Sequence, residues 1–82
     1  RDFADWQQRA AGGDAKFAGD FVDWLLYQAR DAGASDVHLD PMADGLHVRW
    51  RLDGVLQPLG QLPKEVAPNV VALATQAVDA IQ

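Results

Sequence analysis

The chain has 82 residues, which favours a single domain, and its apolar (49%) and charged (23%) fractions are those of a globular rather than a disordered protein. A net charge of −5, from 12 acidic and 7 basic residues, argues against non-specific binding to nucleic acid. The chain contains no cysteine, which excludes disulfides and thiolate metal sites, and no apolar run reaches the ~18 residues of a membrane-spanning helix.

The first predicted element is a short helix over residues 2–11. Its apolar residues Phe3, Trp6 and Ala10 recur every three or four positions and therefore share one face. A pair of glycines then ends the helix. The apolar face either packs on the rest of the domain, which we favour, or forms an exposed docking surface for another protein.

A longer helix is predicted over residues 15–32. Asp14 is suited to be its N-cap, and Gly33 is suited to a left-handed conformation at its C-terminus. We expect its broad apolar stripe to be buried. The stripe comprises Phe17, Phe21, Val22, Trp24, Leu25, Leu26 and Ala29.

After this helix the apolar period changes from 3.6 to 2, which indicates β-strands. Residues 36–40 alternate between apolar and polar side chains. We expect Pro41 to end this strand, because proline has no N–H to donate to a ladder. A turn over residues 43–45 then leads into the next strand.

Residues 46–52 show the cleanest alternation in the chain, with apolar residues at even positions and His or Arg at odd ones. The Asp53-Gly54 pair that follows is typical of a two-residue type I′ hairpin turn. The returning strand is expected to cover residues 55–59 and to end near Pro58 and Gly60. The last helix opens at residues 62–65 and should be regular from about residue 67, because the proline at position 68 fits only a first turn.

The order of these elements predicts an α+β fold, a small three-stranded antiparallel meander with helices packed mainly on one face. Three strands leave two unpaired edges, so we expect further strands beyond Gln82 or pairing with a second copy, which leaves a homodimer open. The other face of the sheet would be polar. It would carry His38, Asp40, His47, Arg49 and Arg51.

This polar face needs no functional explanation by itself, because antiparallel sheets commonly keep one face in water. Arg49 and Arg51 would then be solvated or paired with Asp40 or Asp53. The three tryptophans could serve as stacking platforms for single-stranded nucleic acid. With an acidic chain, packing in the core is the better expectation for all of them: Trp6, Trp24 and Trp50.

Two histidines and a carboxylate are a legitimate ligand set for a metal ion. However, alternate residues of one strand share a face in any case, and we expect no metal site. Paired catalytic carboxylates at Asp36 and Asp40 are not expected either, and Ser35 should cap a turn. The residues considered for the metal site are His38, His47, Asp36 and Asp40.

Three motifs in a fixed order resemble the ATPases of type II secretion and type IV pilus assembly. Residues 34–41 (ASDVHLDP) are similar to the family's ASDIHIEP segment, and residues 44–56 (DGLHVRWRLDGVL) to its DGLRVRYRIDGVL segment. Residues 62–68 (LPKEVAP) look like the opening of the family's next helix. The likeness covers about residues 14–78, and its order and spacing make it specific.

The resemblance implies the accessory domain of a hexameric, cytoplasmic motor ATPase, with residues 1–13 as an N-terminal helix or linker and residues 14–82 as the domain. In that family the domain closes over ATP and Mg²⁺ bound by an adjacent RecA-like domain. The implied nucleotide-contacting residues here are Arg49, Lys64 and, more weakly, Arg51. The implied partners are the RecA-like domain, neighbouring subunits and platform proteins of the inner membrane, without nucleic acid or membrane insertion.

The chain also departs from the family pattern. It has no GxxxxGK(S/T) loop for a nucleotide's phosphates, so we expect no enzymatic activity from it alone. His47 stands where the family often has arginine, and residues 73–82 contain no basic residue. Because the chain begins at Arg1 rather than methionine, we expect a piece of a longer protein.

Two other interpretations stay open. The chain could be a stand-alone module, similar in outline to PAS-like domains, that binds a partner or a small ligand. That interpretation predicts an apolar pocket between the sheet and the helices, whereas the motor interpretation predicts a filled core. The chain could also come from a paralogue that has lost its catalytic domain and acts as a scaffold.

Overall fold

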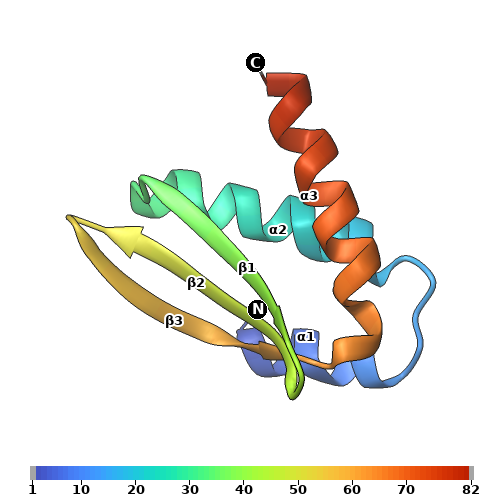
Figure 1. The fold of residues 1–82 in the computed structure, drawn as a ribbon. Helices are drawn as coiled ribbons and strands as arrows, with labels where there is room; N and C mark the ends of the chain where they lie inside the picture. The colour runs from blue at the N-terminus through green and yellow to red at the C-terminus, as the bar shows by residue number, and fades with distance from the viewer. Residues whose placement is uncertain (1, 82) are drawn as a thin grey trace.

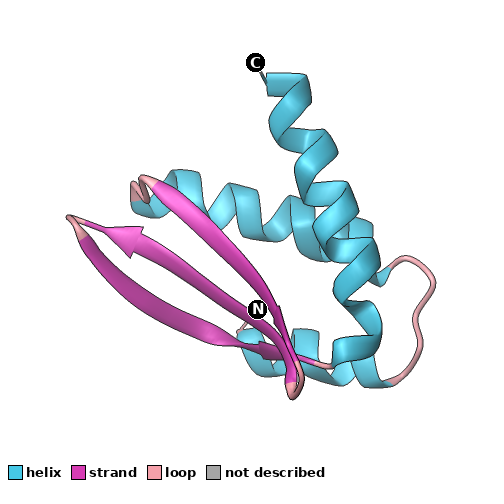
Figure 2. Cartoon of the chain, viewed as in Figure 1, coloured by secondary structure: helices cyan, strands magenta, loops and turns pink. Residues whose placement is uncertain are grey.

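The computed structural model describes residues 2–81, and their side chains as far as residue 77 (Figure 1). The described elements are α1 (Phe3–Ala11), α2 (Phe17–Ala32), β1 (Asp36–Met42), β2 (Gly45–Leu52), β3 (Val55–Leu62), the 3-10 turn η1 (Lys64–Val66) and α3 (Ala67–Ile81). The strands form one antiparallel sheet in the order β1-β2-β3, and the helices lie mainly on one side of it (Figure 2). The predicted α+β meander is confirmed. No described helix is long and apolar enough to cross a membrane.

Helix α1 packs its apolar face into the domain, as favoured from its spacing. Asp2 caps its N-terminus, since the carboxylate accepts a hydrogen bond from the N–H of Asp5 at 3.3 Å. Trp6 is only 3% exposed. Phe3 lies on β3 at Gly60, where a Cβ atom would come within 2.5 Å of the Phe3 ring. The glycine therefore allows α1 to lie directly on the strand.

Helix α2 begins at Phe17, and Lys16 rather than Asp14 is its N-cap residue, so the predicted cap is wrong. Asp14 closes the preceding turn instead. Its Oδ1 accepts a hydrogen bond from the Lys16 N–H at 2.9 Å, and its carbonyl accepts one from the Phe17 N–H at 3.1 Å. Aspartate favours such a turn because its short side chain reaches the backbone two residues on. At the other end Gly33 has a φ of 78°, which confirms the predicted left-handed cap.

Strand β2 is the centre of the sheet and is joined to both neighbours by tight turns (Figure 1). Asp53 and Gly54, between β2 and β3, have φ angles of 51° and 80°. Positive φ at both positions is the requirement of a type I′ turn, so this turn is confirmed. The 3-10 turn η1 leads into α3, which is regular from Ala67 as predicted and holds Pro68 in its first turn.

The predicted strand ends at Pro41 and Pro58 are wrong. Strand β1 includes Pro41 opposite Leu46, and β3 includes Pro58 opposite Arg49. Both are edge strands that pair only with β2. A proline nitrogen that faces away from β2 therefore removes no hydrogen bond from the ladder.

Strand β3 also continues past residue 59, as far as Leu62. The continuation contains a bulge. Val48 lies opposite Gly60, while the next residue of β2 lies opposite position 58. Leu59 is the extra residue between them, and its side chain packs against the core. The bulge thus brings an additional apolar side chain to the inner face.

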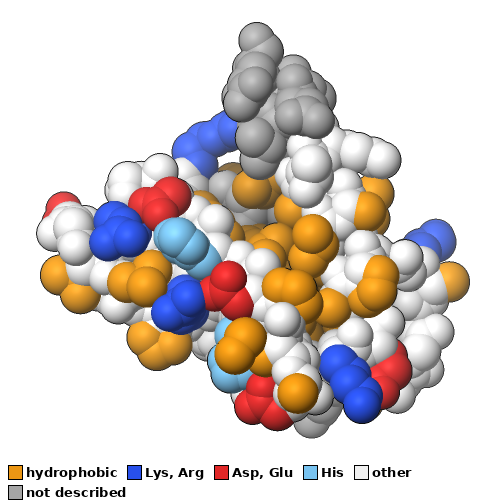
Figure 3. Space-filling view, in the orientation of Figure 1, with side chains coloured by type: hydrophobic (Ala, Val, Ile, Leu, Met, Phe, Trp, Pro, Cys, Tyr) orange, Lys and Arg blue, Asp and Glu red, His pale blue; other side chains and the backbone are white. Residues whose placement is uncertain are grey.

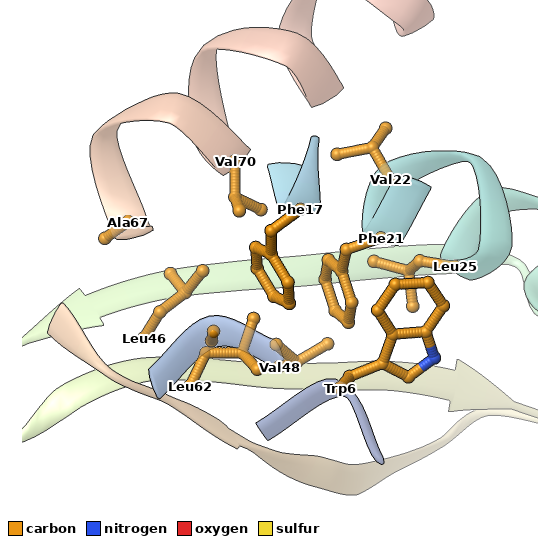
Figure 4. Close-up of a cluster of buried hydrophobic side chains, with 11 residues drawn as sticks. Trp6, Phe17, Phe21, Val22, Leu25, Leu46, Val48, Leu62, Ala67 and Val70 are labelled. Carbon is orange, nitrogen blue, oxygen red and sulfur yellow. The ribbon is translucent and has the colours of Figure 1, made fainter. Parts of the chain in front are cut away.

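The core lies between the helices and the inner face of β2 (Figure 4). Phe21 of α2 is fully buried at its centre. Its ring centroid lies 5.6–5.9 Å from those of four other aromatic rings, Phe3, Trp6, Phe17 and Trp24. Leu46 and Val48 of β2 close the core from the other side and are 0% exposed. Aromatic rings therefore fill the space between the two layers.

The core packing predicted for the tryptophans holds for Trp6, which is buried, and for Trp24, which packs against the core. Trp50 lies on the inner side of β2, opposite Val37, and is half-buried. The core cluster of the described residues does not include it. The β2–β3 hairpin extends beyond the end of α2 in Figure 1, so this part of the sheet has less cover.

Candidate functional site

The face of the sheet without helices carries the polar residues of β1 and β2 (Figure 3). Residues that lie opposite each other in an antiparallel pair point to the same face. Three cross-strand pairs therefore share this surface, Asp36 with Arg51, His38 with Arg49 and Asp40 with His47. We call these six residues the polar face, and it contains two of the three residues that the sequence implicates in nucleotide contact.

Both arginines of the polar face are held by carboxylates. The Nη2 of Arg49 donates a hydrogen bond to Oδ2 of Asp40, its diagonal neighbour on β1. The Nε of Arg51 lies 3.3 Å from Oδ1 of Asp36. The pairing of Arg49 with Asp40 was foreseen, whereas Arg51 pairs with Asp36 and not with Asp40 or Asp53. The side chains of Arg49 and Asp40 are 40% and 39% exposed, so the pair stabilises the fold by only about 0–1 kcal/mol.

Each of the two histidines is paired with an aspartate two or three residues before it in the sequence. His38 Nε2 lies 2.5 Å from Oδ2 of Asp36, whose Oδ1 accepts a hydrogen bond from the Ser35 hydroxyl at 2.7 Å. The Ser35 hydroxyl, and next the His38 imidazole, lower the pKa of Asp36 from its ordinary value. Among the described residues, no three potential ligands come together as a metal site.

Asp44, in the β1–β2 turn, was not singled out from the sequence. Its Oδ1 lies 2.8 Å from Nε2 of His47, three residues further on. The hydrogen bond from His47 lowers the pKa of the Asp44 carboxyl. The tight turn is the signal that could have revealed the pair, because it brings residues on either side of it together.

The Asp44–His47 pair gives a testable pH dependence of stability. A depressed folded-state pKa stabilises the fold above the carboxyl's unfolded value, about 3.9, and this contribution is lost as pH falls through the folded value. Asp44→Asn should therefore lower the urea midpoint at pH 6, and its difference from the unchanged chain should shrink below about pH 4. His47→Ala should reproduce this pattern. A difference that is equal at pH 6 and pH 3 would show that the pair does not form.

A shallow hollow of about 320 Å³ lies beside Arg49. Its lining joins the end of β1 to the middle of β2, and consists of Asp40, Pro41, Met42, His47 and Arg49. Within the described part of the chain, the Nε of Arg49 is buried and has no hydrogen-bond partner. The guanidinium group beside the hollow thus has one donor, Nε, that the described residues leave unused, and guanidinium groups bind phosphate oxygens in pairs.

The other two predicted contact residues do not line this hollow. Arg51 belongs to the polar face but is held at Asp36. Lys64 is exposed at the start of η1, and the described residues offer it no ion pair. The structure therefore brings Arg49 together with Asp40 and His47 but leaves Lys64 outside the group.

Comparison with known proteins identifies relatives of one kind. The chain is 43% identical over 51 residues to the type IV pilus assembly ATPase TfpB of Acinetobacter baylyi, a match that covers 62% of this chain. It is 35% identical over 60 residues to the type IV pilus assembly ATPase PilB of Thermus thermophilus, covering 73% of this chain. It is also 43% identical over 51 residues to the protein transport protein HofB homologue of Haemophilus influenzae, again covering 62%.

The matched segments span only 9%, 7% and 11% of these three relatives. No family model matches the chain, and no solved structure matches it. The resemblance seen in the three sequence motifs is confirmed by these relatives. The chain is homologous to a short segment of the ATPases of type IV pilus assembly and type II secretion.

Proposed function

We propose that this chain is the non-catalytic accessory domain of a hexameric motor ATPase for pilus assembly or protein secretion. In this proposal it closes over a nucleotide that an adjacent RecA-like domain binds. The homology to pilus assembly ATPases supports the motor context. The observation that carries the finer proposal is the position of Arg49, at the middle of the polar face and on the rim of a hollow.

The chemistry of Arg49 suits this role. Its guanidinium is always charged and presents donors in a planar fork that matches phosphate oxygens. An arginine supplied to a transferring phosphoryl group by a neighbouring element stabilises the charge of the transition state. Arg49 belongs to the polar face, and the described helices lie on the other side of the sheet (Figure 1), so a catalytic domain could approach it without rearrangement of the core.

The proposal has three further parts, which concern the nucleotide, the partners and the other two basic residues. ATP and Mg²⁺ would be held by the adjacent domain, because this chain has no GxxxxGK(S/T) sequence to cradle the phosphates. Neighbouring subunits and inner-membrane platform proteins would be the macromolecular partners, and the motor would work on the cytoplasmic side of the membrane. Lys64 and Arg51 would add weaker contacts to the nucleotide or to the adjacent domain.

The rival proposal, a stand-alone PAS-like module, requires an apolar pocket between the sheet and the helices. In the described part of the chain the rings of Phe17, Phe21 and Trp6 occupy that space (Figure 4). A small ligand would have to displace side chains that are 0–3% exposed. An open apolar hollow of about 320 Å³ lies at the edge of this region, between Pro41 of β1 and the start of α3. The core itself is filled, and this packing supports the motor proposal over the ligand-sensing one.

The test is the ATPase activity of a motor that carries this domain together with its catalytic domain. Arg49→Ala should reduce turnover about tenfold or more, which corresponds to about 1.4 kcal/mol of lost transition-state stabilisation. Arg30→Ala is the matched control, since Arg30 is an exposed arginine of α2 outside the polar face. Unchanged turnover in the Arg49 variant, or an equal loss in both variants, would contradict the proposal.

A further inference from the structure

The guanidinium of Arg49 is already bonded within this chain. Asp40, nine residues earlier, accepts a hydrogen bond from its Nη2. The register explains this contact, because His38 lies opposite Arg49 and Asp40 lies opposite His47, which makes Asp40 the diagonal neighbour of Arg49. The Asp40 carboxylate therefore already accepts from Nη2, a donor that would otherwise be available to a phosphate oxygen.

Asp40 also lines the hollow beside Arg49. A polyphosphate that entered the hollow would meet this negative charge at short range as well as the guanidinium. Like charges at such distances repel each other, and partial burial makes the repulsion stronger than in open water. Asp40 thus opposes binding in two ways, by holding the donor and by repelling the ligand.

The Arg49–Asp40 pair leaves one hydrogen-bond donor of Arg49 unsatisfied. Arg49 uses Nη2, while its Nε is buried and has no hydrogen-bond partner among the described residues. A buried donor without a partner costs free energy, so the present position of the guanidinium carries a penalty. Rotation of the side chain away from Asp40 and into the hollow would expose Nε to a new acceptor.

We infer that Asp40 is a built-in counter-ion that holds Arg49 in a resting position, from which a polyphosphate must displace it. The inference rests on the proposed function, in which Arg49 contacts the nucleotide's phosphates. Asp40 is a positioning residue here and keeps the isolated domain from binding polyphosphate tightly. Arg49 is released only when the rest of the nucleotide site supplies additional binding energy.

The experiment titrates the 82-residue chain with inorganic tripolyphosphate at low ionic strength and follows by NMR both the backbone amide signals, which every variant has, and the Nε–H signal of Arg49 where it is present. Asp40→Asn keeps the size of the side chain and removes its charge, and should tighten binding about tenfold. Asp20→Asn is the matched control. Asp20 also accepts a hydrogen bond from an arginine, Arg9 Nη2 at 2.8 Å, but lies on α2. This control should change the affinity less than twofold, about what one exposed distant charge contributes.

Two further variants separate this inference from the proposed function. Asp40→Glu restores the charge and should bind as weakly as the unchanged chain. Arg49→Gln, combined with Asp40→Asn, should abolish the gain in affinity, with folding verified by circular dichroism. If Asp40→Asn binds no more tightly than Asp20→Asn while loss of Arg49 still weakens binding, Asp40 is not a counter-ion and the proposed function stands.

If loss of Arg49 leaves the affinity of Asp40→Asn unchanged, Arg49 does not contact phosphate, and both the proposed function and this inference are wrong. If Asp40→Asn does not bind tripolyphosphate at all, this inference is overturned, because removal of the counter-ion was expected to permit binding. In that case the ATPase measurement on Arg49→Ala still decides the proposed function independently.

Discussion

Replacing Phe21 with alanine should unfold the chain or bring it close to unfolding at 25 °C. Phe21 is fully buried and contacts four other aromatic rings, so its truncation removes the centre of the core. Truncations of buried phenylalanine cost about 3–5 kcal/mol. A core of a domain this small rarely supplies more than about 3–5 kcal/mol of net stability. Urea unfolding followed by circular dichroism measures the loss.

Tyr27→Ala is the control for this prediction. Tyr27 lies on the same helix as Phe21 but is 68% exposed, and exposed substitutions usually change stability by about 0.5 kcal/mol or less. Phe21→Leu should give an intermediate loss and keep the chain folded enough for a measurement. Equal midpoints for Phe21→Ala and Tyr27→Ala would mean that the packing of α2 on the sheet differs from the one described.

The second large effect is expected at Gly45, the buried first residue of β2. Its φ of 144° is a conformation that side chains rarely adopt, and a Cβ there would lie 2.5 Å from the carbonyl oxygen of Leu62. That oxygen cannot move freely, because Leu62 pairs with Leu46 in the ladder. Backbone strain of about 1–3 kcal/mol and a steric cost of similar size should make Gly45→Ala lose about 2–6 kcal/mol.

Gly19→Ala is the matched control because the same change occurs in the first turn of helix α2. A Cβ at Gly19 meets no atom within 4 Å, and alanine favours the helix over glycine by up to about 0.5–1 kcal/mol. The two substitutions should therefore shift the urea midpoint in opposite directions. Gly45→Ala should also shift the Arg49 Nε–H signal. Gly45 pairs with Met42 at the β1–β2 turn, so a distortion there would move the end of β1, which carries Asp40. A stabilised Gly45→Ala variant would refute the close approach of β2 to β3.

Much of the sheet could be predicted because its signals are local. The alternation of residues 46–52 assigned each side chain of β2 to a face, and Asp53-Gly54 specified the turn that follows. Pro41 and Pro58 misled the prediction because their cost depends on which side of the strand has a neighbour. That information is absent from the strand's own sequence, since it depends on β2 being the central strand.

The candidate site could be predicted only in part for a similar reason. The sequence shows that Arg49 lies on a polar face, but its partner is set by the register of β1 against β2. The Asp14 cap and the Asp44–His47 pair depend on turn geometries that several sequences can adopt. Lys64 follows β3, which continues to Leu62 instead of ending near Pro58, so its separation from the polar face could not be predicted from the sequence.

The central position of β2 has a mechanical consequence. Strand β2 pairs with a neighbour on each side of Arg49, although the pairing with β3 is interrupted by the bulge between Val48 and Arg49, so the strand cannot slide without breaking contacts in two directions. The side-chain torsions of Arg49 are then its main local freedom. A rigid-body rotation of the whole domain relative to a neighbouring domain would therefore rotate the guanidinium by the same angle.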